Sequence, residues 1–254
     1  MIDSHCHLDF NCFDHDRAQI LENCSKLSIN TIVLPGTQAS QWQKQIDLCN
    51  LFPQLRFALG VHPYFLQHFD SSHLVKLTHL LEHYQNKVVA LGEIGLDTHI
   101  DVDWQLQKYV FEQQLTIAKE QQLPVILHHR NSHNELIRIL KTTQFSQGGV
   151  VHAFSGSLQE AQTYIDLGFK IGVGGGITYP RANKTRKTIA QLPLYTLVLE
   201  TDAPDMPIMG KQGQRNSPEY LPDIFESLLA LRKETRHELL QACSKNVRDS
   251  LLLA

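Results

Sequence analysis

The amino-acid sequence predicts an α/β protein with the fold of a TIM barrel, the (β/α)8 arrangement. Eight short runs rich in Val, Ile and Leu recur along the chain, and each ends in Gly, Pro or a charged residue. Runs of this kind are typical of parallel strands that are buried on both faces. Segments with helical periodicity lie between them. Eight strand–helix units in 254 residues match the length of one barrel.

The expected strands are spread from the first residues to the last quarter of the chain. They are residues 2–7, 30–36, 56–63, 88–97, 124–130, 149–154, 169–175 and 197–204. Helical periodicity is clearest over 103–122 and 132–144. After the last strand we expect a helix at 216–232 or 235–252 to complete the barrel, the other being an addition. Since no linker or low-complexity segment interrupts the chain, residues 1–254 are expected to form a single domain.

An open, doubly wound sheet is the alternative that this pattern allows. Such a sheet has a glycine-rich phosphate-binding loop after an early strand. The glycine-rich run GVGGG at 172–176 follows the seventh expected strand and lacks the GxGxxG spacing. It indicates a tight strand end, so the barrel is favoured.

Composition limits the classes of partner and compartment. The net charge of −3 gives no broad basic surface, so a nucleic acid would have to be held locally. The five cysteines are scattered without a CxxC pair, which disfavours a disulfide framework and a thiolate zinc site. Asp3 and His5 interrupt any leading apolar run, and no stretch reaches the roughly 18 apolar residues of a membrane span. We therefore expect a cytoplasmic protein.

Side chains capable of metal binding or acid–base chemistry collect where the expected strands end. They are His5, His7, His62, Glu93, Asp97, His128, His129, His152 and Asp202, with Arg130 beside them. The carboxyl ends of barrel strands meet at one mouth, which is where barrel enzymes have their active sites. Imidazoles and carboxylates from several strands at one mouth favour a metal site over a purely structural polar cluster.

The candidate ligands also indicate the number and type of metal ions. Imidazole and carboxylate ligands without thiolates suit Zn²⁺, Mn²⁺ or Fe²⁺ and, less well, Mg²⁺. Six candidates are too many for one tetrahedral site and suit two divalent ions that share a bridging carboxylate. Two such ions, about 3.5–4 Å apart, would generate hydroxide near neutral pH and hold a scissile phosphate or carbonyl.

Six motifs, in this order, resemble the TatD family of metal-dependent deoxyribonucleases: SHCHLD, GVHP, GEIGLD, PVILHHR, HAFSGS and LETDAP. ITYPRANKTR and TDAPDMPIMGKQGQRNSP are similar to the YjjV-type branch of that family. The resemblance covers residue 2 to about residue 250. It implies a TIM barrel of the metal-dependent hydrolase type that cleaves phosphodiester bonds, often from the 3′ end of DNA. DNA ends or single-stranded DNA would be the substrate, with no membrane and no obligate protein partner.

The resemblance also implies a role for each matching residue. His5 and His7 would bind one metal ion, His128 and His152 the second, and Glu93 would bridge the two. Asp202 would hold the first ion and take a proton from the attacking water, which makes Asp202 and Glu93 the catalytic residues. An alternative for Asp202 is an N-cap before the following helix, because TDAP resembles a capping sequence.

Arg130 and His62 are the expected substrate-binding residues. A guanidinium matches the oxygens of a phosphate, although Arg130 could instead form an ion pair with a barrel carboxylate such as Glu200. His62 could contact the phosphate, hold an extra metal ion or bond to a neighbouring loop. Glu200 shares the inward face of its strand with Asp202, so we expect it to orient a ligand histidine. Asp97 is expected to be a loop or helix-start residue.

Strand alternation alone does not decide between His128 and His129, because both faces of a barrel strand are apolar. The family pattern places the ligand at His128, with Arg130 on the same side of the strand. If His129 were the ligand, Arg130 would point away from the mouth.

The chain departs from the family pattern at the rim of the mouth. Position 64 is Tyr where many relatives have His, and the loop after TDAP is longer than in many relatives. Four cations follow the seventh and eighth strands and are expected either to contact phosphates or to be solvated: Lys184, Arg186, Lys211 and Arg215.

The alternative function is an amidohydrolase-type hydrolase of an amide, lactone or other small ester. Many of those bridge their metals with a carboxylated lysine, whereas the fourth strand here supplies a carboxylate in GEIGLD.

Overall fold

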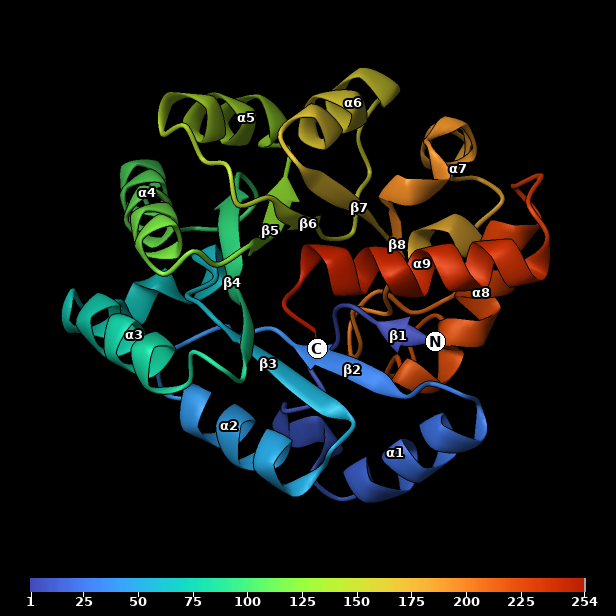
Figure 1. Cartoon of the computed structure of the whole chain (residues 1–254), viewed down its shortest axis with the longest axis horizontal. Coiled ribbons are helices and arrows are strands. Elements are labelled where there is room, and N and C mark those ends of the chain that lie inside the picture. Colours follow the sequence, from blue (N-terminus) through green and yellow to red (C-terminus); the bar gives the residue numbers. More distant parts are fainter. Residues whose placement is uncertain (254) are drawn as a thin grey trace.

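A computed structural model describes residues 1–253, and it contains eight parallel strands in the order β1 to β8 (Figure 1). The strands are β1 (Ile2–Asp3), β2 (Thr31–Leu34), β3 (Leu55–Leu59), β4 (Val88–Asp97), β5 (Val125–Arg130), β6 (Gly149–Val151), β7 (Phe169–Val173) and β8 (Leu197–Leu199). Each pairs in parallel with the next along the chain. The strands form a nearly closed ring with helices outside it, which confirms the predicted TIM barrel.

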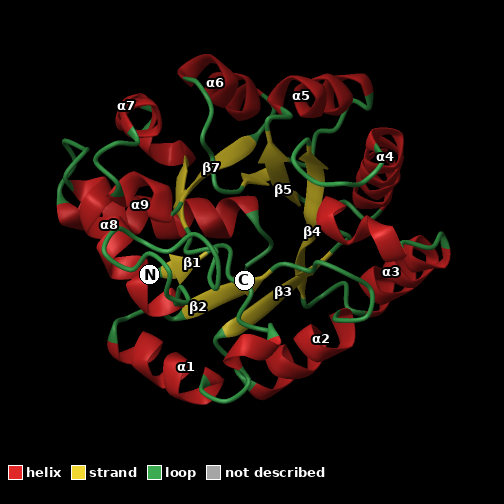
Figure 2. Ribbon diagram, turned by 180° about the vertical axis from the view of Figure 1, so that it is seen from behind, coloured by secondary structure: helices red, strands yellow, loops and turns green. Residues whose placement is uncertain are grey.

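Helices connect the strands and cover the outside of the ring (Figure 2). They are α1 (Arg17–Lys26), α2 (Trp42–Leu51), α3 (Ser72–His83), α4 (Trp104–Glu120), α5 (His133–Thr142), α6 (Leu158–Asp166), α7 (Asn183–Gln191), α8 (Leu221–Leu229) and α9 (Arg236–Ser250). The predicted helices 103–122 and 132–144 are α4 and α5, and both segments expected after the last strand are helical. None of the helices in residues 1–253 is long and apolar enough to cross a membrane.

The first and last strands are shorter than predicted, and backbone bonds beyond them close the ring. The Ser4 N–H donates to the Leu199 carbonyl and the Asp202 N–H donates to the His5 carbonyl, both at 2.9 Å. The Cys6 N–H donates to Val33 on the other side, at 3.0 Å. The segment after β1 is therefore held between the second and eighth strands, which positions its side chains at the mouth.

The C-terminal segment closes the opposite end of the barrel. Val247 and Leu251 are buried in one apolar cluster with side chains from inside the barrel: Ile2, Val33, Ala58, Val89, Ala90, Ile126, Val150 and Val198. The Leu252 N–H donates to the Val89 carbonyl, at the start of β4, at 2.9 Å. In both views the chain that follows α9 runs to near the centre of the strand ring (Figures 1 and 2). The barrel thus has an apolar floor, which leaves only the mouth for polar groups.

Three glycines set the spacing of neighbouring strands just below the mouth. A Cβ atom on Gly36 would lie 2.8 Å from the Gly60 nitrogen, and one on Gly60 would lie 2.8 Å from the carbonyl carbon of Gly92. The Gly36 N–H donates to Gly92 and the Glu93 N–H donates back to Gly36, both at 2.8 Å. Because only glycine permits this approach, these residues fix the backbone that carries Glu93.

The apolar floor predicts that substitutions of two adjacent leucines have different effects on the free energy of unfolding. Leu251 is fully buried, whereas Leu252 is 55% exposed. We expect Leu251→Ala to lower the free energy of unfolding by about 2–5 kcal/mol, because it leaves a cavity in the core. Leu252→Ala, the matched control, should change it by less than about 0.5 kcal/mol. Urea unfolding followed by circular dichroism measures both, and equal effects of the two substitutions would contradict the assignment of the floor.

Candidate metal centre

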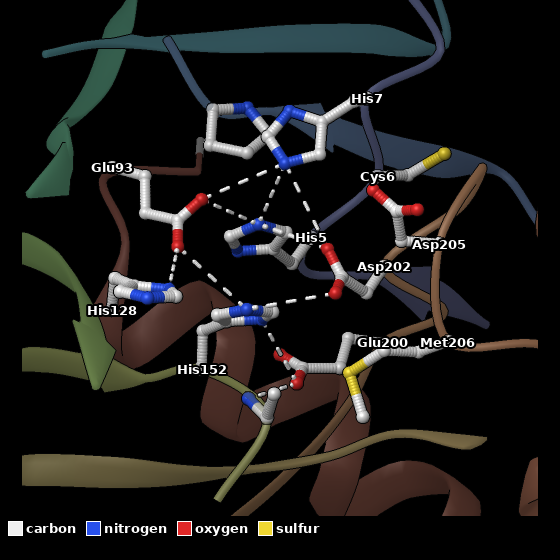
Figure 3. A network of polar contacts seen from close by, with 12 residues as sticks. His5, Cys6, His7, Glu93, His128, His152, Glu200, Asp202, Asp205 and Met206 are labelled. Atoms are coloured by element: carbon white, nitrogen blue, oxygen red, sulfur yellow. Dashed lines mark hydrogen bonds and ion pairs between the residues drawn. The ribbon is translucent and has the colours of Figure 1, made fainter. Parts of the chain in front are cut away.

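Six of the predicted site residues converge at the mouth of the barrel (Figure 3). They come from β4, from β5 and from the segments after β1, β6 and β8, and are Glu93, His128, His5, His7, His152 and Asp202. All are buried apart from His128, which is partly exposed. Except for His5, which lies deeper, they line a cavity of about 480 Å³ that opens to solvent. The structure therefore assembles the predicted ligands in one place.

Glu93 is the central group of this cluster. Its Oε2 lies 3.1 Å from His5 Nε2 and 3.6 Å from His7 Nε2. Its Oε1 lies 3.0 Å from His128 Nδ1 and 3.7 Å from His152 Nε2. The two carboxylate oxygens thus face different imidazole nitrogens.

Asp202 lies beside the same histidines. Its Oδ1 is 3.5 Å from His5 Nε2 and 3.7 Å from His7 Nε2, and its Oδ2 is 3.7 Å from His152 Nε2. The alternative of an N-cap is wrong. The next helical turn begins only at Pro218 and is capped by Ser217.

The cluster shows the mixture of charge states expected of a buried cation site. The pKa of Glu93 stays well below its usual value despite burial, because His5, His62 and His152 surround it and His128 bonds to it. Burial raises the pKa of Asp202 to about 6 even though His152 and His7 oppose the shift. Burial lowers the pKa of His5 to about 4. The centre thus holds a carboxylate and a neutral imidazole in contact, both of which are electron-pair donors.

The donor set fits divalent metal ions. His5, His7 and Glu93 offer ligand atoms within 4.8 Å of one another, and so do His62, Glu93 and His128. The Nδ1 atoms of His5 and His7 are buried without a hydrogen-bond partner among residues 1–253. Their Nε2 atoms lie 3.3 Å apart and both face Glu93. Nitrogen and oxygen donors that converge at such distances, without thiolates, suit Zn²⁺, Mn²⁺ or Mg²⁺.

Two buried carboxylates support the ligands from below. Asp3 lies under His5 and accepts hydrogen bonds from the Thr201 hydroxyl at 2.6 Å and the Thr201 N–H at 3.0 Å. Glu200 is fully buried and lies 3.3 Å from His152 Nδ1, although the two atoms are not aligned for a hydrogen bond. Its Oε1 also accepts the Ala153 N–H. Glu200 therefore lies where the sequence expects a residue that orients a ligand histidine.

Strand β5 places His128 in the cluster and His129 outside it. His129 packs on the other side against His133 and Phe154, with ring centroids 4.1 and 5.9 Å away. Arg130 lines the same cavity as His128, as the family pattern implies. Within residues 1–253 Arg130 makes no ion pair, so the alternative pairing with Glu200 is wrong.

His62 also lies in the cluster, with its Nε2 3.5 Å from Glu93 Oε1. Its Nδ1 accepts the Tyr64 N–H at 3.1 Å. An Nδ1 that accepts a bond carries no proton, so the neutral ring carries its proton on Nε2. His62 therefore presents a hydrogen-bond donor to the cavity, which differs from the electron pair that a metal ligand must offer.

Sequence reasoning missed the contact that Asp97 makes. Asp97 is the last residue of β4, and its Oδ2 lies 3.3 Å from His128 Nε2. It was expected in a loop or at a helix start. The signal was present, because Asp97 lies four residues after Glu93 and strand alternation puts both on one face. Thr37, Phe10 and Asp205 also line the cavity without having been predicted.

Two of the four cations expected to contact phosphates are engaged within the protein. Arg215 pairs with Asp16 and also donates to the Cys12 carbonyl. Arg186 donates to the Ile177 carbonyl. These two side chains therefore have partners in loops of the protein, and contact of the four cations with phosphates stays a prediction.

Comparison with known proteins agrees with this geometry. The model of the TatD-related DNase family matches residues 2–251. The chain belongs to the TatD family. The metal-dependent hydrolase YjjV of Escherichia coli K12 is 46% identical over 246 residues, covering 96% of this chain and 95% of that relative. A Rahnella protein named as the 3′–5′ ssDNA/RNA exonuclease TatD is 32% identical over 251 residues, covering 95% and 94%.

A solved structure is similar along the whole chain. The crystal structure of the TatD homologue YjjV from E. coli K12 superimposes with a TM-score of 0.97 at 44% identity, covering 100% of this chain and 98% of that one. With the family assignment, this identifies the protein as an enzyme, a metal-dependent hydrolase of the TatD family. The predicted family is confirmed.

Gly172 in β7 provides the space for Glu200. A Cβ atom at this position would lie 2.5 Å from Glu200 Oε2, whereas one on Gly176 would meet no atom within 4 Å. We expect Gly172→Ala to displace the carboxylate that lies against His152 and to weaken metal binding about 10- to 100-fold. Gly176→Ala is the matched control and should bind metal like the wild type. Titration calorimetry with Mn²⁺ measures both, and unchanged affinity in Gly172→Ala would contradict the supporting role of Glu200.

Metal binding to this centre should release protons. Burial lowers the pKa of His7 and of His128, but Glu93 and the other nearby carboxylates outweigh it and raise each pKa to about 9. At pH 7 both rings are therefore protonated on both nitrogens, and a cation must displace one of these protons to bind. Metal affinity should increase as the pH rises toward about 9. Calorimetry in buffers of different ionisation enthalpy counts the protons. We expect at least one per protein at pH 7, and a count of zero would show that the rings are neutral.

Proposed function

We propose that this hydrolase is a phosphodiesterase that acts on DNA, as a 3′–5′ exonuclease on single strands or ends, and that it uses two divalent metal ions. The proposal rests on the position of Glu93, whose two carboxylate oxygens face separate sets of histidines. A carboxylate placed in this way could be shared by two divalent ions, which together would hold the scissile phosphate. The name of the Rahnella relative, an ssDNA/RNA exonuclease, supports the choice of substrate.

The ligands divide between the two ions according to the oxygen that they face. His5, His7 and Asp202 would hold the first ion, His128 and His152 the second, and Glu93 would bridge them. When bound, Zn²⁺, Mn²⁺ or Mg²⁺ ions polarise the phosphodiester and lower the pKa of water. Glu200, 3.3 Å from His152 Nδ1, would orient that ligand, and Asp3, which accepts from Thr201, would hold the segment that leads to Asp202.

Asp202 is proposed as the general base. Its carboxylate lines the cavity next to His7 and His152, and burial raises its pKa to about 6. A base with a pKa close to the working pH is ionised and still has a useful affinity for a proton. Asp202 would therefore accept the proton that the attacking water loses.

Arg130 and His62 are proposed to bind the substrate. Arg130 lines the cavity with no ion-pair partner in the described chain, so its guanidinium is available to phosphate oxygens. The Nε2–H of His62 offers a second donor on the Glu93 side of the cavity. Together they would bind the phosphate from two of the strand ends.

The substitution Asp202→Asn tests the proposal. Purified wild-type protein with Mn²⁺ or Mg²⁺ should shorten a 5′-labelled single-stranded oligonucleotide, and a chelator should stop it. Asp202→Asn should lower the rate by about 10²- to 10⁴-fold, because the amide cannot accept a proton. Asp166→Asn, an exposed position on α6, is the control and should cleave normally. Equal cleavage by Asp202→Asn would rule out the general base. Hydrolysis of lactones or N-acyl amino acids without cleavage of DNA would instead establish the amidohydrolase alternative.

A further inference from the structure

Three aromatic side chains line the cavity above the metal centre, and the proposed chemistry does not use them. They are Phe10, Tyr64 and Phe65. Tyr64 is 60% exposed, and its hydroxyl makes no hydrogen bond with any residue of the described chain. An apolar ring exposed at the rim of a polar site loses favourable burial unless a ligand covers it. The rim therefore has a surface suited to a flat, apolar group.

The backbone holds Tyr64 in place at this rim. It belongs to a short 3-10 helix, Pro63–His68, that begins directly after His62. Its N–H donates to His62 Nδ1, and the Phe65 N–H donates to the His62 carbonyl at 3.0 Å. The Phe65 ring contacts Tyr64 edge-on, with centroids 5.1 Å apart. The backbone of Tyr64 is thus held next to His62, whose own side chain points into the metal cluster.

We propose that Tyr64, supported by Phe65, is the stacking site for a nucleobase of the strand whose phosphate lies at the metal centre. This inference rests on the proposed function. A phosphodiester has no apolar face, whereas every nucleobase has one, and base–aromatic stacking is the usual way to bind single strands. Arg130 from β5 and Tyr64 from the loop after β3 line one cavity, so a nucleotide could place its phosphate on one and its base on the other.

Stacking on Tyr64 would bind a base without regard to its identity. Stacking accepts any base, since it depends on the π-face alone. The site therefore fits single-stranded nucleic acid as a class and no particular sequence.

A second tyrosine of the same exposure provides a matched control. Tyr195 is also 60% exposed, but it lies just before β8, at the end of that strand away from the metal cavity. Lys170 Nζ lies 5.6 Å from the centroid of the Tyr195 ring. Exposure alone would give both tyrosines the same effect. Only Tyr64 lines the metal cavity, so only Tyr64 should affect the binding of a base.

Binding of a fluorescent strand tests the inference without cleavage. The probe is an oligothymidylate with 2-aminopurine as its 3′-terminal base, titrated with full-length protein in the presence of a chelator. We expect the wild type, Tyr64→Phe and Tyr195→Ala to quench the probe equally. Tyr64→Ala should abolish the quenching and raise the Kd about 5- to 150-fold, equivalent to about 1–3 kcal/mol of stacking. A strand with an abasic 3′ terminus should bind wild type and Tyr64→Ala with the same affinity.

The outcomes separate this inference from the proposed function. A wild type that quenches the probe, but does not cleave DNA once metal is added, would refute the nuclease and leave the stacking site standing. A wild type that cleaves DNA, yet binds abasic and natural strands equally, would refute the stacking site alone. Equal quenching by Tyr64→Ala and the wild type would also refute it. Unchanged thermal unfolding of Tyr64→Ala would show that its defect is local.

Discussion

A carboxylate buried among five imidazoles is the interaction on which this molecule is organised. Nitrogen atoms of five histidines lie between 3.0 and 3.7 Å from the two oxygens of Glu93: His5, His7, His62, His128 and His152. A carboxylate removed from water is costly unless positive charge or hydrogen bonds compensate it. These histidines therefore form the environment that keeps Glu93 ionised, and four of them, all except His62, are also potential metal ligands.

The barrel provides this environment because its two ends differ in polarity. The floor is apolar and is completed by Val247 and Leu251, so water and charge have no access from below. The mouth collects the polar ends of the strands, and the close approach of Gly36, Gly60 and Gly92 fixes the backbone that carries Glu93. The low dielectric of the floor strengthens every electrostatic contact above it. The apolar core thus contributes to the chemistry as well as to stability.

Sequence reasoning reached the barrel and the ligand cluster because both depend on local patterns. Apolar runs that end in His or Glu are visible along the chain, and alternation places Glu93 on the inward face of its strand. Contacts between distant segments were not predictable in this way. Asp16, the partner of Arg215, lies at the far end of the sequence, so an arginine that looked free for phosphate is an internal pair. The choice between His128 and His129 likewise needed the packing of His129 against His133.

The closure of the ring between the segments after β1 and β8 also determines when the site can exist. His5 and Asp202 come from opposite ends of the chain, and their neighbourhood depends on the bond between the Asp202 N–H and the His5 carbonyl. A chain still emerging from the ribosome has His5 and His7 early but lacks Asp202, and it lacks the floor until its last residues appear. A chain that has not reached Asp202 therefore lacks part of the predicted ligand set. The predicted centre is complete only once the segments after β1 and β8 have met.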